Sequence, residues 1–326
     1  MYADCVRRAA RSYAPVGFEV SGGLDSSANF CAAQRLMRGG KLQAPGILGY
    51  TLALQGHGEA DEIAYARAVG EHLGLPVHEI APAYPDPSWY QDRAQRTKDF
   101  PGFPNAALQI NLRRQAASDG CRVLVSGEGG DAFLQGSRSY YAEELQQGRW
   151  GTAFGCLKED IAASGTAQTL RWFVRDGLLP LLPQKTETRI FDLVRRFRAI
   201  IGSGPSSLLS RRDRANLLSP HMRRRLDEQR SRAADTFDCC QAGQRVLRSA
   251  LESGLSSLVI ANIERLGAEA GLEMRYPMRS TSFVQAAFAT PERLRLRGGV
   301  AKYLHVSAMQ GILPQKVVDR RDKAEF

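Results

Sequence analysis

The most constraining feature of this sequence is a predicted strand-to-helix junction at residues Phe18–Ser27. An apolar run ends in Ser-Gly-Gly, and an acidic residue and two hydroxyl residues then open a helix. Glycines let a backbone approach an anion closely, and the first turn of the helix directs free N–H groups at it. No lysine follows the glycines, which excludes the common GxxxxGK[ST] phosphate loop. Ser21, Ser26 and Ser27 would add hydroxyl donors, and Asp25 is a candidate ligand for a metal ion beside phosphates.

Apolar strands and amphipathic helices alternate through the first half of the chain. We expect strands at Val16–Val20, Gly46–Leu54, Pro76–Ile80 and Arg122–Ser126. Helix-type spacing of apolar residues predicts helices at Ala3–Tyr13, Ser26–Arg38, Asp61–Leu73 and Ala106–Ser118. Buried strands that alternate with helices predict an α/β fold, in which helices cover both faces of a parallel sheet. Ligands of such sheets bind beyond the carboxyl ends of the strands.

A second glycine-rich acidic loop, Ser126–Asp131, follows the fourth predicted strand. Its sequence is Ser-Gly-Glu-Gly-Gly-Asp, so the backbone can again approach a ligand closely. Because both loops lie at the carboxyl ends of strands, we expect them to face one site. Asp131 is a second hard oxygen ligand, and with Asp25 it would share a Mg²⁺ ion. Two such loops in this order are a far more specific signal than one.

The second half of the chain differs in character from the first. From about Ala142 helical patterns dominate, and we place a soft boundary near Trp150 in this chain of 326 residues. Residues 1–149 would form the α/β core, and residues 150–326 would form a mainly helical half that binds the substrate. No low-complexity linker separates the halves, so we expect them to pack as one unit.

The positive charge of the chain is concentrated in one region. The formal net charge is +10, and many arginines crowd the stretch between residues 195 and 225. Such a cluster would suit an acidic partner such as RNA. However, acidic residues are interleaved with these arginines, and aromatic residues do not alternate with them as in a nucleic-acid platform. We therefore interpret them as solvated helix faces and expect no nucleic-acid partner.

Cysteine usage and hydropathy predict a cytoplasmic protein. The six cysteines form no CxxC pair and no cluster with histidines, so we interpret them as reduced thiols rather than zinc ligands. The five histidines show no metal spacing and are interpreted as structural. No apolar run approaches the ~20 residues needed to span a bilayer, and the N-terminus lacks a secretory signal. We therefore expect no membrane partner.

Two later blocks complete a pattern that covers nearly the whole chain. Gly271–Pro277 resembles an S-x-E-x-R-x-P segment, with glycine at the serine position. Lys302–Leu304, Leu313–Pro314 and Arg321–Phe326 resemble a K-x-x-L…LP…R-x-K-x-x-F string. Together with the two loops, these blocks resemble the synthetase domain of asparagine synthetase and its relatives. The relatives include the β-lactam synthetases and the lasso-peptide macrolactam synthetases. The resemblance implies the PP-loop ATP pyrophosphatase fold, which is similar to that of adenine nucleotide alpha hydrolases.

The resemblance also implies a reaction, its co-substrates and its site residues. A carboxylate would attack the α-phosphorus of Mg-ATP and release pyrophosphate, and an amine would then displace AMP from the acyl-adenylate to form an amide. Lys302 would stabilise negative charge in the second step, and Glu128 would position or deprotonate the amine. Mg²⁺ would be held by Asp25 and Asp131. The residues implied in ATP binding, all within residues 1–149, are Val20, Ser21, Gly22, Gly23, Asp25, Ser26, Ser27, Leu52, Ser126, Gly127, Gly130 and Asp131.

The chain departs from the family pattern at three places. No amidohydrolase segment precedes Tyr2 and Cys5 is not at the amino end, so we expect the amine to come from a partner protein, from another segment or from the substrate itself. The family usually continues beyond Phe326, which predicts a truncated C-terminus. The P-F-L-D of the family is Pro277–Ser280 here, so an aspartate is lost and Arg279 is gained. This change argues against an ordinary aspartate substrate.

Several functions stay open on the sequence alone. Asparagine-type conversion of an aspartate-like carboxylate into an amide is favoured by Glu128, which matches the acid of the asparagine-forming branch. Macrolactam formation on a peptide is favoured by Arg279 and by the basic second half. A tRNA-modifying ATP pyrophosphatase would share the first loop, but it explains neither the second loop nor Lys302. A non-catalytic nucleotide-binding protein is the remaining alternative.

Overall fold

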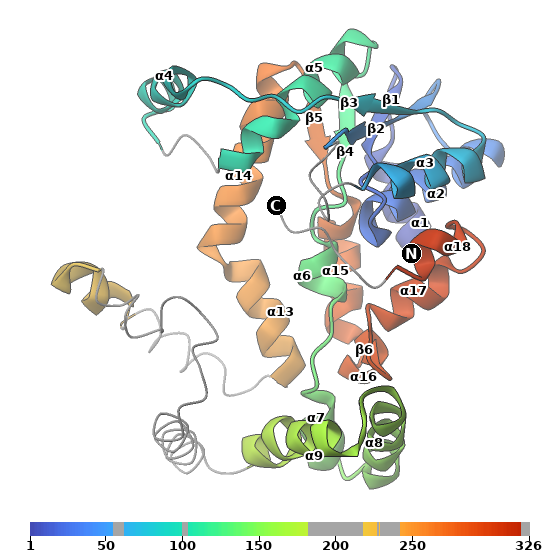
Figure 1. Cartoon of the computed structure of the whole chain (residues 1–326), viewed down its shortest axis with the longest axis vertical. Coiled ribbons are helices and arrows are strands. Elements are labelled where there is room, and N and C mark those ends of the chain that lie inside the picture. The colour runs from blue at the N-terminus through green and yellow to red at the C-terminus, as the bar shows by residue number, and fades with distance from the viewer. Residues whose placement is uncertain (55–61, 100–103, 182–217, 227, 229–241, 321–326) are drawn as a thin grey trace. The chain divides into compact units, whose positions relative to one another are not determined.

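The computed structural model describes residues 1–54, 62–99, 104–181, 218–226, 228 and 242–320 (Figure 1). The chain groups into two compact units. The first unit comprises Met1–Gln135, Ser249–Arg295 and Ala301–Phe326, and the second comprises Gly136–Arg248 and Leu296–Val300. Three features of the sequence lie outside the described residues: most of the arginine cluster, the pair Cys239 and Cys240, and the closing segment Arg321–Phe326.

The first unit is built around a five-stranded sheet in which every neighbouring pair is parallel. The strands lie in the order β3-β2-β1-β4-β5, and they are β1 (Val16–Glu19), β2 (Ile47–Leu52), β3 (Val77–Ile80), β4 (Val123–Val125) and β5 (Glu273–Arg275). The four predicted strands are confirmed, whereas β5 is not anticipated by the sequence pattern. Because β1 lies between β2 and β4, the loops that leave β1 and β4 meet at the carboxyl edge of the sheet.

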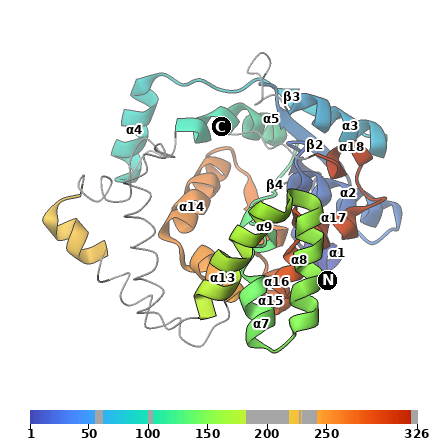
Figure 2. The same cartoon turned by 60° about the horizontal axis from the view of Figure 1, so that its bottom comes forward.

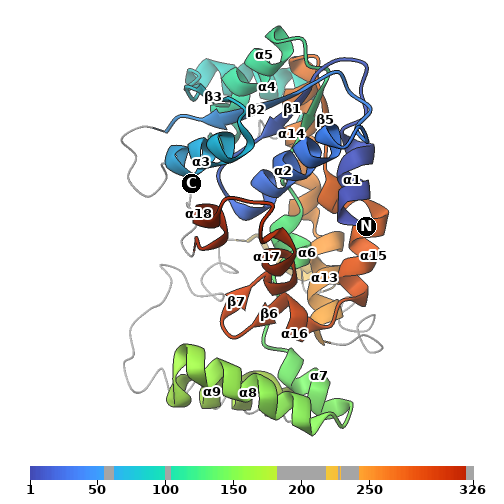
Figure 3. The same ribbon diagram turned by 90° about the vertical axis from the view of Figure 1, so that its right-hand side faces the viewer.

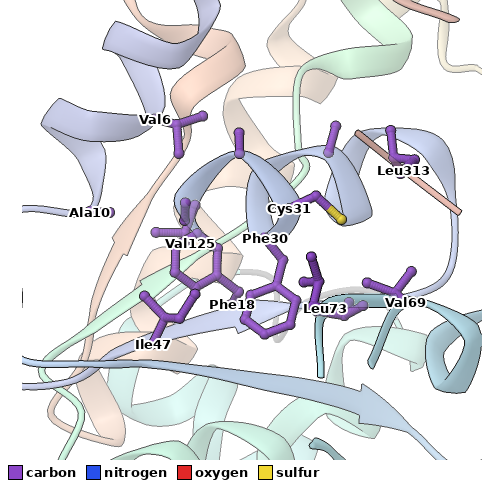
Figure 4. Packing of buried hydrophobic residues seen from close by; sticks show 14 of the residues in the cluster. Val6, Ala10, Phe18, Phe30, Cys31, Ile47, Val69, Leu73, Val125 and Leu313 are labelled. Carbon is purple, nitrogen blue, oxygen red and sulfur yellow. The ribbon is translucent and has the colours of Figure 1, made fainter. Parts of the chain in front are cut away.

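One face of the sheet is covered by helices from both ends of the chain (Figure 3). They are α1 (Tyr2–Ala9), α2 (Leu24–Arg38), α3 (Ile63–Leu73), α17 (Tyr303–Met309) and α18 (Gln315–Val318). Their apolar side chains form one core with the strands, in which the rings of Phe18 and Phe30 lie 5.6 Å apart (Figure 4). Gly49 leaves space for this packing, since a Cβ there would lie 3.0 Å from the Phe30 ring. The buried helix α2 is thereby held with its N-terminus just beyond β1.

The opposite face carries a second, smaller core. It is covered by α5 (Ile110–Ser118), which follows the 3-10 helix η2 (Pro104–Gln109), and by α14 (Gly254–Glu269). Tyr50, Leu112, Leu124 and Met274 are buried in this core. A further helix, α4 (Pro87–Thr97), begins where the Asp86 side chain accepts a hydrogen bond from the Ser88 amide. The predicted α/β class, with helices on both faces of a parallel sheet, is confirmed.

Two helices are shorter than predicted. Helix α1 ends at Ala9 rather than at Tyr13. The carbonyls of Ala9 and Arg11 accept hydrogen bonds from Arg275 Nη1 at 2.9 and 2.7 Å, so this segment is bonded to β5 instead of continuing the helix. The helix predicted from Ala106 is α-helical only from Ile110. Before that point the Leu108 carbonyl accepts the Ala83 amide at 3.1 Å and lies outside the α-helical ladder.

The remaining elements of the first unit border the carboxyl edge of the sheet. They are α6 (Gly130–Leu134), the 3-10 helix η5 (Pro277–Arg279), α15 (Thr281–Ala289) and α16 (Glu292–Arg295). Helix α15 packs against α1 and α6. The chain then passes through Leu296–Val300, which are grouped with the second unit. There the short strands β6 (Leu296–Arg297) and β7 (Val300–Ala301) pair in a hairpin that leads directly to Lys302.

Apart from the hairpin residues Leu296–Val300, the described part of the second unit is helical, as predicted for this region. It contains α7 (Tyr140–Gln146), α8 (Trp150–Ser164), α9 (Thr166–Trp172), the π-helix η3 (Phe173–Leu178), the 3-10 helix η4 (Leu179–Leu181) and most of α13 (Ala242–Glu252). Helices α8 and α9 lie side by side (Figure 2). The buried carboxylate of Asp160 accepts the hydroxyls of Tyr140 and Tyr141 and so joins α8 to α7. Among the helices that the structure describes in either unit, none has the length and apolarity to cross a membrane.

Candidate functional site

The first loop lies between β1 and α2 and is closed by its own hydroxyl groups. The Ser21 amide donates to Ser26 Oγ at 3.1 Å, and the two serine hydroxyl oxygens lie 2.9 Å apart. Gly22 has a left-handed φ of 76°, and a Cβ there would collide with Tyr65 of α3. Gly23 is the N-cap of α2 and has no side chain with which to bond the first-turn amides. Those amides lack intrahelical partners and are suited to an anion.

Two glycines of the second loop allow it to touch the first. A Cβ on Gly127 would lie 2.7 Å from the Ser26 amide nitrogen, and a Cβ on Gly130 would overlap the carboxylate of Asp25. The Gly130 amide also donates to the Gly127 carbonyl at 3.3 Å, which forms a tight turn before α6. The loops that follow β1 and β4 are therefore in direct contact at the carboxyl edge of the sheet.

Lys302 bridges the two carboxylates of these loops. Its Nζ is hydrogen-bonded to Asp25 Oδ2 and lies 2.8 Å from Asp131 Oδ1. The side chains of Lys302 and Asp25 are each 14% exposed, whereas that of Asp131 is 52% exposed, so solvent reaches the cluster at Asp131. Lys302 is the N-cap of α17 and has a left-handed φ of 55°. Residues other than glycine seldom adopt this conformation, and when they do they are enriched at functional positions.

The electrostatics of this cluster favour a cation between the carboxylates. Burial alone would lower the pKa of Lys302, but the charges of Asp25 and Asp131 outweigh it and raise the pKa above its ordinary value. No group of three or more metal-binding side chains occurs in the described part of the chain. Mg²⁺ commonly binds through one or two carboxylates, and phosphate oxygens and water complete its shell. Asp25 and Asp131 therefore fit a Mg²⁺ ion that arrives together with a phosphate ligand.

Glu128 of the second loop faces an arginine. Arg279 Nη1 lies 3.4 Å from Glu128 Oε1, and Arg279 Nη2 donates to Ser256 Oγ at 2.9 Å. Burial raises the pKa of Glu128, and the positive charge of Arg279 opposes this rise. A Cβ on Gly129 would lie 2.7 Å from the stem of Arg279, so the arginine packs directly on the loop. The sequence marks Arg279 only as a departure from a family motif, and Ser256 carries no signal that would have identified it.

The residues implied in nucleotide binding include the ends of three neighbouring strands. Val20 follows β1, Leu52 ends β2 and Ser126 follows β4. Val20 is buried, and its amide donates to the Tyr50 carbonyl at 2.8 Å. Ser27 is completely buried, and its hydroxyl has no hydrogen-bond partner among the described residues. The strand ends therefore share one edge, while Val20 and Ser27 themselves are covered by surrounding atoms.

Asn29 in α2 is a site residue that the sequence analysis missed. It is fully buried, and its Nδ2 donates to the Ser126 carbonyl at 3.0 Å. Its Oδ1 accepts the Tyr2 hydroxyl at 2.8 Å. This amide therefore joins α1, α2 and the second loop. One sequence signal could have identified Asn29, because it is a polar residue among the apolar positions of a predicted helix. Buried amides are usually hydrogen-bonded, so such a residue is expected to bond to neighbouring elements.

The fold is that of an α/β domain of the PP-loop kind, with two acidic glycine-rich loops in contact at the edge where such sheets bind ligands. Compared with known families, the chain matches asparagine synthase over residues 2–326. The chain therefore belongs to the asparagine synthase family, and the resemblance seen in the sequence is confirmed at this level. Membership supports ATP-dependent formation of an amide. A comparison with curated proteins found no match.

Proposed function

We propose that this protein activates a carboxylic acid with ATP and transfers the acyl group to an amine, with release of AMP and pyrophosphate. The observation that carries the proposal is the meeting of Asp25, Asp131 and Lys302 at one point. Two carboxylates suited to Mg²⁺ and an ammonium group suited to a developing negative charge lie together beside an anion-binding loop. Nucleotide binding alone would not require a lysine at this point.

In the first step, an oxygen of the substrate carboxylate attacks the α-phosphorus of ATP, and the bond from this phosphorus to the bridging oxygen of pyrophosphate breaks. The first-turn amides of α2 and the hydroxyls of Ser21 and Ser26 bind the leaving pyrophosphate. Mg²⁺ held by Asp25 and Asp131 would supply charge neutralisation. Such transfers depend mainly on positioning and charge neutralisation, which these residue types provide.

In the second step, the amine attacks the acyl carbon, and AMP leaves as the amide forms. Lys302 donates a hydrogen bond to the oxyanion that develops on the acyl oxygen, an interaction typically worth about 10²–10³-fold in rate. Glu128 accepts the proton that the amine loses. Because burial raises the pKa of Glu128, this carboxylate is a stronger base than an exposed glutamate.

The acid and the amine define two candidate products. Family membership favours an asparagine-type product, made from an aspartate-like carboxylate. Macrolactam formation on a peptide is the alternative, and it is supported by the fixed positive charge of Arg279 beside Glu128, which suits a larger acidic substrate. In the first case we propose that a partner protein supplies the amine, and in the second that the peptide carries it.

Pyrophosphate exchange tests the first step. The protein is incubated with ATP, Mg²⁺, labelled pyrophosphate and either aspartate, acidic peptides or ring-bearing acids. Label that enters ATP only in the presence of an acid would support adenylation. ATP binding without exchange for any of these acids would contradict the proposal and favour a nucleotide-binding protein.

The substitution Lys302→Ala tests the second step. We expect ATP binding to persist and amide formation to fall by about 10²-fold or more, because the charge that stabilises the oxyanion is lost. Lys41→Ala, which removes an exposed lysine, is the matched control and should keep wild-type turnover. Wild-type turnover in Lys302→Ala would contradict the role given to this lysine.

A further inference from the structure

A cavity of about 140 Å³ adjoins Lys302 on the side of α15 and α17. Its walls are mainly apolar, and its principal lining residues are Tyr2, Phe133, Phe283, Ala287, His305 and Met309. All of these residues apart from Tyr2 are at most 6% exposed. All of them belong to the first unit. Lys302 therefore forms part of the cavity wall, whereas none of the loop residues assigned to the phosphates lines it.

The size and openness of the cavity suit a small ring. An engineered cavity of about 150 Å³ lined by aliphatic and aromatic residues binds benzene, and this cavity is nearly as large. Leu304, which is 46% exposed, and Ala308, which is also exposed, line its outer part, so a ligand can enter from solvent. A large apolar pocket with few polar groups is the usual form of a small-molecule subsite.

One polar group in the cavity lacks a partner. His305 is 5% exposed, and its Nε2 has no hydrogen-bond partner among the described residues. Burial lowers the pKa of His305 to about 3, and the charge of Lys302 acts in the same direction, so the ring is neutral. A neutral imidazole nitrogen takes part in one hydrogen bond, as donor or as acceptor. The hydroxyl of Tyr2, which also lines the cavity, is already bonded to Asn29.

The cavity is poorly suited to a small polar acid. Arg295, the other cationic lining residue, forms an ion pair with buried Glu292. Among the described residues, no carboxylate lines the cavity to bind an α-ammonium group. A polar substrate group placed here would lose its hydration without gaining partners, which costs free energy. A ring with one hydroxyl would instead fill the apolar space and meet His305.

We propose that this cavity is the subsite for a phenol-like ring carried by the carboxylic acid that the protein activates. The ring is assigned to the acid rather than to the amine because Lys302 lines the cavity and Glu128 does not. This inference rests on the proposed function, and it narrows the substrate to acids with an apolar ring close to the reacting carboxylate.

Binding of small rings without ATP tests the cavity directly. Ligand-observed NMR would measure the binding of p-cresol and toluene to the full chain. We expect p-cresol to bind about fivefold more tightly than toluene, as one hydrogen bond to His305 allows. Ala287→Leu fills the cavity and should weaken binding of both ligands by about tenfold or more. Ala289→Leu makes the same change at an exposed position of α15 and should bind both as the wild type does.

Circular dichroism would show whether Ala287→Leu folds, and a second variant keeps the test valid if it does not. Ala308→Leu narrows the cavity from its exposed outer part and carries less risk to the core. His305→Phe keeps the cavity apolar and should remove the preference for p-cresol over toluene. Failure of the wild type to bind either ring, or equal binding by the folded cavity variants and Ala289→Leu, would overturn the inference.

Exchange assays separate this inference from the proposed function. We expect 3-(4-hydroxyphenyl)propionate to support pyrophosphate exchange better than succinate, and Ala287→Leu to reverse that order. Exchange with aspartate or succinate but not with ring-bearing acids would overturn the subsite and leave the proposed function standing. Ring binding without exchange for any acid would overturn the proposed function and the assignment of the ring to an acid.

Discussion

Arg279 Nη1 lies 3.4 Å from Glu128 Oε1, although the two residues are 151 positions apart in the chain. The pair joins the loop after β4 to the 3-10 helix η5 after β5, so neighbouring strands bring the two charges together. Burial raises the pKa of Glu128, and Arg279 is the main influence that lowers it. The arginine therefore extends to lower pH the range in which this carboxylate is ionised and can serve as the proposed base.

Replacing Arg279 by methionine should move the acidic limb of the pH profile for amide formation. Without the guanidinium group the pKa of Glu128 rises further, so the active carboxylate is protonated at a higher pH. We expect the limb to move upward. Arg279→Lys keeps the charge and should move it less. Unchanged profiles in both variants would show that Glu128 is not the base.

Asp131→Asn should weaken Mg²⁺-dependent binding of ATP. One of the two carboxylates suited to the metal is lost, and we expect the affinity to fall by about tenfold or more, or about 1.4 kcal/mol. Titration calorimetry with Mg²⁺ and with EDTA measures this. In EDTA the variant should bind ATP as well as or better than the wild type, because a negative charge near the phosphates is gone. Asp92→Asn, at an exposed position, is the control.

Gly130→Ala should disturb the contact between the two loops. A Cβ at this first position of α6 would overlap the Asp25 carboxylate, and overpacking of this kind typically costs about 1–3 kcal/mol. Gly254 is likewise the first residue of its helix, α14, and no atom lies within 4 Å of a Cβ placed there. Gly254→Ala should therefore be neutral or stabilising. Equal melting temperatures of the two variants would contradict the observed packing.

The neutral, buried His305 should make the protein less stable in acid. The unfolded chain binds a proton at this residue below the ordinary pKa of 6.5, whereas the folded protein does so only near pH 3, so stability falls as pH decreases through this window. Between pH 7 and pH 5 the loss is about 2 kcal/mol.

Urea unfolding at pH 7 and pH 5 would measure this loss. The free energy of unfolding should differ less between pH 7 and pH 5 in His305→Gln than in the wild type, by about the amount of this loss. This holds whatever the overall stability of the variant. His221→Gln, at an exposed position, should keep the wild-type difference. The same pH dependence in wild type and His305→Gln would show that the imidazole is not buried as described.

The sequence predicts those parts of the site that are encoded locally. A strand, two glycines and a helix start within ten residues already define the first loop, and parallel strands place the second loop on the same edge. Two features escaped prediction because they depend on distant segments. The short strand β5 returns to the sheet late in the chain, and only its pairing with β4 brings Arg279 to Glu128. Likewise, no local pattern reveals that Lys302 is held between two carboxylates.

The separation of Asp25 and Lys302 by 277 positions has a consequence during synthesis. Ribosomes add about 5–20 residues per second, so roughly 15–55 s pass between the appearance of the first carboxylate and that of its lysine. In the later part of this interval, after Asp131 has been made, both carboxylates are present without the ammonium group that bridges them. A nascent chain therefore carries both acidic loops before it carries the lysine that bridges them.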